Sequence, residues 1–451
     1  MISVRNRNIV IIGAAKSGVA AARMLQHRGT RVFVTDSGEI NTSIRRLLVD
    51  ANISYEENGH SKKAESGDFA VVSPGVPTEA ALVQCYLKSG KKVYSEIEAA
   101  SWFCESPILA VTGSNGKTTT VNWLAYTRKV AGKQHLLAGN IGMAFSDVIP
   151  RTDPQTDMIL EVSSFQLDHI ESFSPKVSIL LNITPDHLNR YGNKFENYAN
   201  SKLRITENQG PGDSAIYWHD DALLKNHFSK PKQDGPEIFA FSDTTEVANG
   251  AFVRDGNIYL KTKNKEEFLM NEDDISLPGR HNLLNGLATA LSARVSEIGN
   301  EAIRESLSKF KGVEHRFELV REKNGVRYYN DSKATNVNAV WYALNSFKVP
   351  VVLILGGQDK GNDYSDLIEP IREKVQAIMA IGEARQKIQD QLAYAVPEFH
   401  TCSSMEEAVL MASKIAKKGQ VILLSPACAS FDMFENYEAR GDMFKSLVNN
   451  L

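Results

Sequence analysis

The chain has 451 residues, which is too long for one hydrophobic core, because domains usually hold about 100–200 residues. Its composition is that of an ordinary globular protein and its formal net charge is only −3, so no overall field favours nucleic acid or an anionic membrane as a partner. No stretch approaches the roughly 18–20 apolar residues of a membrane span, and the scattered cysteines indicate reduced thiols, so we expect a cytoplasmic protein.

The first segment has the pattern of a strand, a glycine turn and a helix. Residues 8–13 form an apolar run that predicts a buried strand, and the turn at 13–18 leads into a helix. A second strand over 31–35 ends at Asp36, where an acidic side chain can meet a ribose hydroxyl. Ala15 stands where the dinucleotide fingerprint has its middle glycine. The residues therefore leave open whether this turn binds a ligand or only packs.

A further strand of the same domain is predicted over residues 69–73. It runs into the rigid segment 74–77, which lies on the same edge as Asp36 if the sheet is parallel. Val93 and Tyr94 close the last strand, so we predict that the first domain ends near residue 98.

The second domain opens with the clearest motif of the chain. An apolar strand over 108–112 breaks into a glycine-bounded loop before a helical segment over 121–129. Glycines allow backbone N–H groups to close on phosphate oxygens, the helix start adds unpaired N–H groups, and a lysine supplies a point charge. The loop is shorter than the usual pattern, because Val111 occupies the first glycine place. Nucleotide phosphate binding, rather than a plain strand-turn-helix, is predicted for Gly113, Ser114, Asn115, Gly116, Lys117, Thr118 and Thr119.

Further polar residues of this domain lie in a turn after the phosphate-loop helix and at the ends of two strands. Asn140 lies in a glycine-rich turn, Glu161 ends a buried strand, and His187 follows the next strand. Because ligands gather outside the carboxyl ends of parallel strands, we expect Lys117, Glu161 and His187 to converge. A carboxylate beside a phosphate loop suits Mg²⁺, for which Thr118 offers a hydroxyl. The alternatives are a helix-terminal acid for Glu161 and a capping or packing role for His187.

The rest of the second domain carries weaker signals. Lys202 lies in a predicted helix over 195–207 and, by composition alone, is a solvated surface lysine. From about residue 213 to 269, short β-type runs separated by Gly, Asn and Asp suggest a small antiparallel insert. Asn285 lies near the start of a helix that ends near Val295, where it either contacts a base or phosphate or caps the helix.

Another alternation of strands and helices begins near Gly312. One strand leads into the polar segment 330–336, and later strands lead into the loops 356–361 and 425–430, which predicts a second dinucleotide-type sheet. We therefore expect an α/β protein with an N-terminal Rossmann-like domain, a central phosphate-loop domain with a small antiparallel insert, and a C-terminal Rossmann-like domain. The predicted limits are residues 1–98, 99–312 and 313–451.

Three α/β units with one ATP-type loop suggest a ligase or kinase in which separate domains bring separate substrates to a γ-phosphate. Several motifs along nearly the whole chain resemble those of the Mur ligases of peptidoglycan assembly, most closely the branch that adds D-glutamate. These motifs are residues 112–119, 161–167, 186–187, 279–285, 315–318, 330–336 and 424–432.

The resemblance implies domains that bind a UDP-sugar, ATP and an amino acid, in that order along the chain. It implies that ATP phosphorylates the carboxylate of UDP-N-acetylmuramoyl-L-alanine, and that the amine of D-glutamate then displaces phosphate from the acyl phosphate. Two Mg²⁺ ions and Lys117 would offset the negative charge gathered between the substrates. We expect a monomer that has no nucleic-acid or membrane partner.

The resemblance also assigns site residues. Thr118 and Glu161 would hold the first Mg²⁺, His187 and a carbamylated Lys202 would serve the second, and these side chains with Lys117 would form the catalytic set. ATP contacts outside the phosphate loop would fall on Asn285, Arg316 and Asp331. The UDP-sugar would meet Ala15, Lys16, Ser17, Asp36, Ser37, Gly75, Asn140 and His187. D-Glutamate would meet Thr335, Lys360, Ser430 and Tyr437, with Lys333 sensing phosphate or carboxylate charge. The chain departs from the family pattern at two positions. Ala15 stands in a glycine position, and Gly38 stands where family members can carry an arginine.

The sequence also allows other functions. A ligase for another amino acid or a folylpolyglutamate synthetase belongs to the same superfamily. The diamino-acid branch is expected to carry an Asp-Asn-Pro-Arg type loop, which this sequence lacks. The segment from Gly13 to Asp36 allows an NAD-linked oxidoreductase, and a non-catalytic nucleotide-dependent scaffold is the third alternative.

Overall fold

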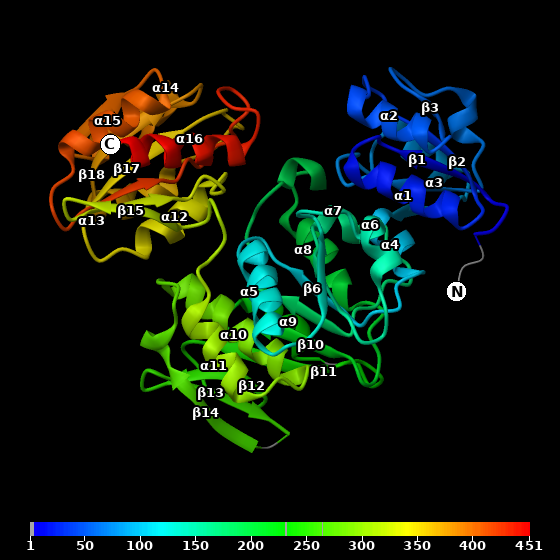
Figure 1. The fold of residues 1–451 in the computed structure, drawn as a ribbon, viewed down its shortest axis with the longest axis horizontal. Coiled ribbons are helices and arrows are strands. Elements are labelled where there is room, and N and C mark those ends of the chain that lie inside the picture. Colours follow the sequence, from blue (N-terminus) through cyan, green and yellow to red (C-terminus); the bar gives the residue numbers. More distant parts are fainter. Residues whose placement is uncertain (1–3, 231, 264) are drawn as a thin grey trace. The chain divides into compact units, whose positions relative to one another are not determined.

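The computed structural model of the chain describes residues 4–230, 232–263 and 265–451. The chain divides into a first unit of Met1–Ile275 with Leu284–Lys309 and a second unit of Ser276–Leu283 with Phe310–Leu451. In the described residues, the first unit contains two β-sheets and the second unit one, each covered by helices (Figure 1). The α/β class with three sheet-centred domains is confirmed, whereas the limits after residues 98 and 312 stay predictions.

The N-terminal sheet is parallel throughout, in the order β3-β2-β1-β4-β5. Its strands are β1 (Asn8–Ile12), β2 (Arg31–Thr35), β3 (Ser54–Glu56), β4 (Phe69–Val72) and β5 (Val93–Ser95). Its helices are α1 (Lys16–His27), α2 (Thr42–Asp50), α3 (Ala81–Lys88) and α4 (Glu96–Ser101). Side chains alternate along β1, so Ile9 and Ile11 join the core with α1, whereas Val10 and Ile12 join the core with α3. Helices on both faces explain why these parallel strands are continuous apolar runs.

The central sheet runs in the order β14-β13-β12-β11-β10-β9-β6-β8-β7. Its strands are β6 (Ile108–Thr112), β7 (His135–Gly139), β8 (Asp157–Glu161), β9 (Val177–Leu180), β10 (Ser214–Trp218), β11 (Glu237–Ser242), β12 (Gly250–Arg254), β13 (Asn257–Thr262) and β14 (Lys265–Asn271). Neighbours from β7 to β12 pair in parallel, and β13 pairs antiparallel with β12 and β14. The antiparallel insert is therefore limited to β12–β14. The strands β10 and β11, predicted to belong to it, continue the parallel sheet, because the helix α9 between them permits a crossover.

Helices of the central domain cover this sheet. They are α5 (Lys117–Val130), α6 (Phe145–Val148), α7 (Ser164–Leu167), α8 (Phe195–Leu203), α9 (Ala222–Phe228), α10 (Arg280–Val295) and α11 (Asn300–Lys309). The buried Trp123 of α5 donates its indole N–H to the carbonyl oxygen of Ser306 in α11 at 3.2 Å, which fixes these two helices together. Across the described part of the chain, none of the helices combines the length and the apolar character needed to cross a bilayer.

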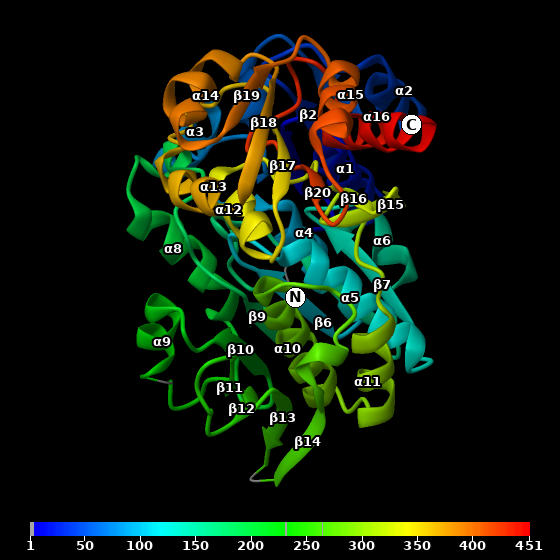
Figure 2. The ribbon, with the colours of Figure 1, turned by 90° about the vertical axis from the view of Figure 1, so that its left-hand side faces the viewer.

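The C-terminal sheet runs in the order β15-β16-β20-β17-β18-β19, and only its first pair is antiparallel. Its strands are β15 (Glu318–Lys323), β16 (Val326–Asn330), β17 (Val351–Gly356), β18 (Val375–Ile381), β19 (Glu398–Thr401) and β20 (Val421–Leu424). Its helices are α12 (Val337–Asn345), α13 (Ile368–Lys374), α14 (Arg385–Leu392), α15 (Met405–Ile415) and α16 (Tyr437–Asn450). Leu353 and Leu355 of β17 face the core shared with α12, α13 and α14, and Val352 and Ile354 face the core with α15 and α16. Figure 2 shows these helices on the two sides of the sheet.

The strand order of the central sheet brings the polar segments together. The strands β9, β6, β8 and β7 are successive neighbours and run in the same direction. The loops that follow them therefore leave the same edge of the sheet, where parallel α/β sheets bind ligands. At this edge lie His187 and Asn140 in loops, Lys117 at the start of α5, and Glu161 at the end of β8.

Candidate active site

The loop between β6 and α5 has the backbone of a phosphate cradle. Gly113 and Gly116 adopt φ angles of +151° and +88°, and a Cβ at Gly116 would collide with Oδ1 of Asn285. Both positions therefore require glycine. The ammonium group of Lys117 donates to the carbonyl oxygens of Gly113 at 2.7 Å and of Ser114 at 2.8 Å, so its charge lies over the loop. The start of α5 adds backbone N–H groups and a positive dipole end to the same place.

Neighbouring segments hold this loop in shape. The hydroxyl of Ser114 donates to the carbonyl oxygen of Thr184 at 2.8 Å and lies 3.0 Å from the hydroxyl of Tyr198. The backbone N–H of Asn115 donates to Oδ1 of Asn182 at 2.9 Å, and the amide nitrogen of Asn182 donates back to the carbonyl oxygen of Asn115 at 3.1 Å. The loop is thus braced by the segment after β9 and by α8.

Glu161 lies beside this loop with both carboxylate oxygens engaged. Its side chain is buried, Oε2 accepts from the hydroxyl of Thr118 at 2.7 Å, and Oε1 accepts from the amide of Asn140 at 2.9 Å. A carboxylate and a hydroxyl next to a phosphate cradle are the hard oxygen donors that Mg²⁺ takes together with phosphate oxygens. The described residues contain no cluster of three His, Cys, Asp or Glu that could hold a metal alone. The hydroxyl of Thr118 and the carboxylate of Glu161 fit a Mg²⁺ that arrives with a phosphorylated substrate.

Lys202 is buried, so its interpretation as a solvated surface lysine is wrong. Only 2% of the residue is exposed, and its ammonium nitrogen donates to the carbonyl oxygen of Gly113 at 2.9 Å. Burial lowers the pKa of Lys202 well below its ordinary value and the charge of Lys117 lowers it further, although Asp186, Glu161 and Asp168 act in the opposite direction. Composition misses this burial because a helix of mixed polarity does not reveal which face turns inward.

His187 lies at the rim of the same edge. It adopts a left-handed backbone with φ of +52°, and 52% of its side chain is exposed. Its Nε2 lies 3.6 Å from a carboxylate oxygen of Asp186, and its ring centroid lies 5.2 Å from that of Phe165 in α7. Because Asp186 also acts on the pKa of Lys202, this turn and the phosphate loop share one end of the sheet.

The first turn of the N-terminal sheet is built around Asp36. Its Oδ2 accepts from the backbone N–H of Ala14 at 2.7 Å and its Oδ1 from that of Gly38 at 2.9 Å. Ala15 precedes α1 with φ of −86°, a conformation open to any residue, so the chain needs no glycine there. The expected ligand positions at this edge are exposed or half-buried, namely Ala15, Lys16, Ser17, Asp36, Ser37 and Gly75.

The N-terminal and central domains are joined by a cation next to the His187 turn. The guanidinium of Arg190 lies 4.4 Å from the ring centroid of Phe165 and donates to the carbonyl oxygens of Val76 at 3.0 Å and Gly75 at 3.2 Å. The loop after β4 therefore lies against the polar edge of the central sheet. Sequence reasoning missed Arg190 because its partners are backbone carbonyls far away along the chain.

The second unit contains a buried acid at the end of β16. Oδ2 of Asp331 accepts from the hydroxyl of Ser425 at 2.9 Å, and Oδ1 accepts from the backbone N–H of Phe317 at 3.2 Å. Burial raises the pKa of Asp331 to about 7 against the opposing effects of the Ser425 hydroxyl and the Arg316 charge. Arg316 and Asp331, two expected ATP contacts, are therefore electrostatic neighbours.

The expected D-glutamate residues fall into two groups within this unit. The ammonium of Lys333 lies 3.7 Å from the ring centroid of Tyr437, and Thr335 follows in the same loop. Lys360 is exposed and Ser430 is buried, on loops that are hydrogen-bonded neighbours through the N–H of Gln358 and the carbonyl oxygen of Ala429 at 2.9 Å.

Sequence reasoning also missed the residues that shape these loops. The fully buried guanidinium of Arg440 donates to the carbonyl oxygens of Ser332 at 2.8 Å and of Ala429 at 3.1 Å. The side chains of Tyr198 and Asn182 likewise hold the phosphate loop through hydrogen bonds. An arginine in an amphipathic helix carries no local sign of this role, whereas Asn182 at a strand end could have been suspected.

Comparison with known families is consistent with this arrangement. Residues 8–82 match the MurD N-terminal domain, residues 111–293 the Mur ligase middle domain, and residues 315–428 the glutamate ligase domain of Mur ligases. The chain is 49% identical over 99% of its length to a UDP-N-acetylmuramoylalanine–D-glutamate ligase of Salinibacter ruber, of which 99% is covered. It is 43% identical over 98% of its length to the enzyme of that name from Porphyromonas gingivalis W83, of which 99% is covered.

Solved structures share the fold at low sequence identity. UDP-N-acetylmuramate-alanine ligase MurC from Thermotoga maritima matches with a TM-score of 0.60 and 16% identity, over 99% of this chain and 100% of that one. A pseudomurein peptide ligase type C from Methanothermus fervidus matches with a TM-score of 0.61 and 17% identity, over 99% and 100% of the two chains. Together with the full-length curated relatives, these matches show that the chain belongs to the Mur ligase family.

Proposed function

We propose that the chain is an ATP-dependent amide ligase that joins D-glutamate to UDP-N-acetylmuramoyl-L-alanine in cytoplasmic peptidoglycan precursor synthesis. The observation that carries this proposal is the phosphate loop with Thr118, Glu161 and Lys202 at one sheet edge, in a chain whose relatives of that name match over full length at 40–49% identity. This arrangement supports a ligase over a dehydrogenase or a non-catalytic scaffold, because the polar edge of the central sheet carries the groups that bind and act on a triphosphate.

The chemistry follows from the poor leaving ability of a carboxylate oxygen. A carboxylate oxygen of the UDP-substrate attacks the γ-phosphorus of ATP, the bond to the bridging oxygen breaks, and ADP leaves. The neutral amine of D-glutamate then attacks the acyl carbon, phosphate leaves with the bonding electrons, and the nitrogen loses a proton. Lys117 offsets the negative charge that gathers on the phosphates during both steps.

Metal binding is assigned to the oxygen donors of this edge. Thr118 and Glu161 would hold a first Mg²⁺, and His187 and a carbamylated Lys202 would serve a second. When bound, Mg²⁺ offsets phosphate charge and orients the γ-phosphate. The buried Lys202 supports this assignment, because a lowered pKa favours the neutral amine, which is the form that reacts with CO₂.

The substrate contacts are proposed domain by domain. Residues 1–98 bind the UDP-sugar around Asp36, residues 99–312 bind ATP, and residues 313–451 bind D-glutamate around Lys333, Lys360 and Ser430. Asn140 meets the diphosphate or sugar part of the UDP-substrate, and Asn285 meets ATP beside Gly116. The acting species is a monomer.

The test is ADP formation by the purified full chain with UDP-N-acetylmuramoyl-L-alanine, ATP and a panel of amino acids. We expect ADP only when the UDP-substrate and D-glutamate are both present, and almost none from Lys117→Ala. Turnover with L-lysine or diaminopimelate but not with D-glutamate would assign another ligase. Full turnover by Lys117→Ala would refute the phosphate-loop assignment.

A further inference from the structure

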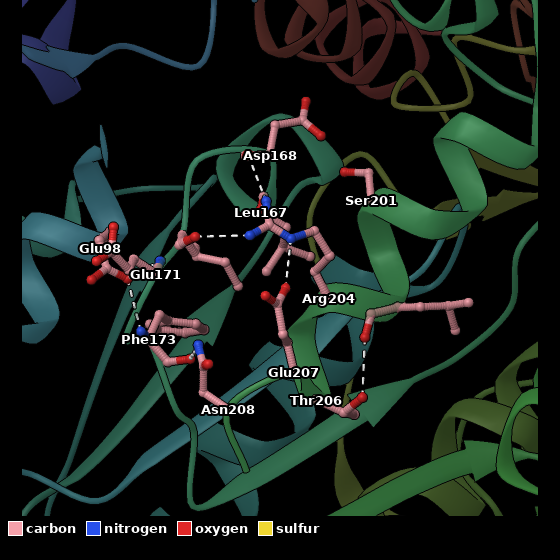
Figure 3. A network of polar contacts seen from close by, with 12 residues as sticks. Glu98, Leu167, Asp168, Glu171, Phe173, Ser201, Arg204, Thr206, Glu207 and Asn208 are labelled. Carbon is pink, nitrogen blue, oxygen red and sulfur yellow. Dashed lines mark hydrogen bonds and ion pairs between the residues drawn. The ribbon is translucent and has the colours of Figure 1, made fainter. Parts of the chain in front are cut away.

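The loop between α7 and β9 is held by charged groups on two sides (Figure 3). The guanidinium of Arg204 donates to the carbonyl oxygens of Leu167 at 2.8 Å, Asp168 at 2.5 Å and Ile170 at 2.8 Å. Its Nε lies 2.6 Å from a carboxylate oxygen of Glu207, which keeps the guanidinium plane in place. One side chain thus satisfies the carbonyl groups that a helix leaves without partners at its end.

Glu98 holds the following part of the same loop through backbone N–H groups. Its carboxylate is fully buried and accepts from the N–H groups of Glu171 at 3.0 Å and Phe173 at 2.7 Å, and from the N–H of Ser172. The indole of Trp102 adds a further bond at 2.8 Å. Because Glu98 lies in α4, directly after the last strand of the N-terminal sheet, this carboxylate ties the N-terminal domain to the loop.

The clamp formed by Arg204, loop 167–173 and Glu98 lies next to two proposed metal ligands. Arg204 follows the end of α8, two residues after Lys202, and the hydroxyl of Ser201 donates to the carbonyl oxygen of Ser164 in α7 at 2.8 Å. The helix α8 is therefore fastened to α7 on both sides of Lys202. In turn, α7 begins three residues after Glu161 and is started by a capping box of Ser163 and Gln166.

We propose that Arg204 is a positioning residue of the ligase reaction, which through loop 167–173 and Glu98 sets the place of the Lys202 amine relative to Glu161 and Gly113. This proposal rests on the proposed function. The Lys202 amine reaches Gly113 at 2.9 Å from a helix that has its fixed points at Ser201 and Arg204. A displacement of about 1 Å at a reacting centre can cost about 100-fold in rate.

The test compares Arg204→Met, which removes every hydrogen bond of the guanidinium, with Arg204→Lys, which keeps the charge and reaches fewer carbonyls. The control is Arg254→Met in β12, at another arginine held by several polar contacts, here with the carboxylates of Glu246 and Glu266. We expect Arg204→Met to lower kcat about 10–100-fold and to raise the Mg²⁺ concentration for half-maximal rate, with the KM for ATP and for the UDP-substrate nearly unchanged. Arg204→Lys should recover part of the loss, and the control should match the wild type.

A second readout does not depend on turnover. The protein is equilibrated with ¹³C-bicarbonate, and the carbamate carbon is followed by NMR, with Lys202→Ala marking the background. We expect a carbamate signal in the wild type and in Arg254→Met, and at most half of it in Arg204→Met.

The proposal is overturned if Arg204→Met keeps the wild-type Mg²⁺ dependence and carbamate signal. It is also overturned if kcat falls only in proportion to the folded fraction, since that marks a purely structural role. If Arg204→Met does not fold, Arg204→Lys decides by the same two readouts. A wild-type chain that forms no product would instead refute the proposed function, while the carbamate comparison would still report on the clamp.

Discussion

Two amine side chains, Lys117 and Lys202, donate to the same carbonyl oxygen, that of Gly113. Their mutual repulsion and the burial of Lys202 both disfavour its charged form, so the pKa of Lys202 lies well below the ordinary lysine value. A neutral amine can take up CO₂ and become an oxygen ligand next to Glu161. The proposed metal site therefore depends on the protonation state that the fold imposes on Lys202.

The variant Lys202→Ala should lose at least about 100-fold in kcat, because an oxygen anion needed beside the phosphates is missing. Short carboxylates such as acetate or formate should restore part of the rate, since they supply that oxygen. Lys176→Ala, at a half-exposed lysine paired with Asp213, is the control and should neither lose activity nor respond to acetate. Full activity of Lys202→Ala, or of the wild type in CO₂-free buffer, would refute the carbamate.

A second residue-scale prediction concerns Glu96, whose buried carboxylate accepts from the backbone N–H of Ser146 at 2.6 Å. Burial raises the pKa of Glu96 to about 7 from an ordinary value of 4.5, although the Ser146 bond opposes the rise. The folded protein therefore holds this proton between pH 4.5 and 7 while the unfolded chain releases it, so the contribution of Glu96 to stability is present below pH 4.5 and is lost as the pH rises to 7. The loss is of the order of 3 kcal/mol, at 1.36 kcal/mol per pKa unit.

Glu96→Gln keeps the accepting oxygen and removes the titration. Its thermal unfolding midpoint should equal that of the wild type near pH 4.5 and exceed it near pH 8. Asp153→Asn, at a half-buried acid of the same unit whose pKa is lowered by its hydrogen bonds, is the control and should show no gain at pH 8. A constant difference between Glu96→Gln and the wild type across this pH range would contradict the prediction.

At the scale of elements, the backbone of the phosphate loop is tightly constrained. The variant Gly116→Ala places a Cβ against Asn285 at a φ angle of +88°, so the loop must shift. We expect a higher KM for ATP and a loss of at least about 10-fold in kcat/KM. In addition, the folded state should lose the roughly 1–2 kcal/mol that a left-handed alanine costs. Gly132→Ala, with φ of +67° and no atom within 4 Å of the new Cβ, isolates that backbone cost. Equal effects of the two variants on the KM for ATP would contradict the assignment.

The elements of the parallel sheets follow from the sequence because their apolar runs end in glycine or in polar residues, as at Thr112 and Glu161. The pairing of β10 and β11 does not follow, because short strands separated by turn residues are typical of hairpins, and only the packing of α9 shows the parallel crossover. The burial of Lys202 was unpredictable for the same reason. The face that α8 turns inward depends on Ser201 and Arg204, whose partners are backbone carbonyl oxygens of α7.

At the scale of the whole molecule, we propose that the three sheet-centred domains bind separate substrates. The sequence predicts this division because each sheet has its own alternation of strands and helices, and the motifs lie at the ends of strands. It does not predict the cross-links within the first unit, where Arg190 and Glu98 join the N-terminal and central domains. Such contacts pair charged groups with backbone atoms far away along the chain, so they leave no local pattern.

Formation of an acyl phosphate is tested most directly by following the carboxylate oxygen of the UDP-substrate. The UDP-substrate is labelled with ¹⁸O in its carboxylate and incubated with ATP and D-glutamate, and the released inorganic phosphate is analysed by mass spectrometry. We predict that one ¹⁸O appears in phosphate for each amide bond formed, because the carboxylate oxygen leaves with the phosphate when the amine attacks the acyl phosphate. Amide product with unlabelled phosphate, or ADP without amide product, would contradict it.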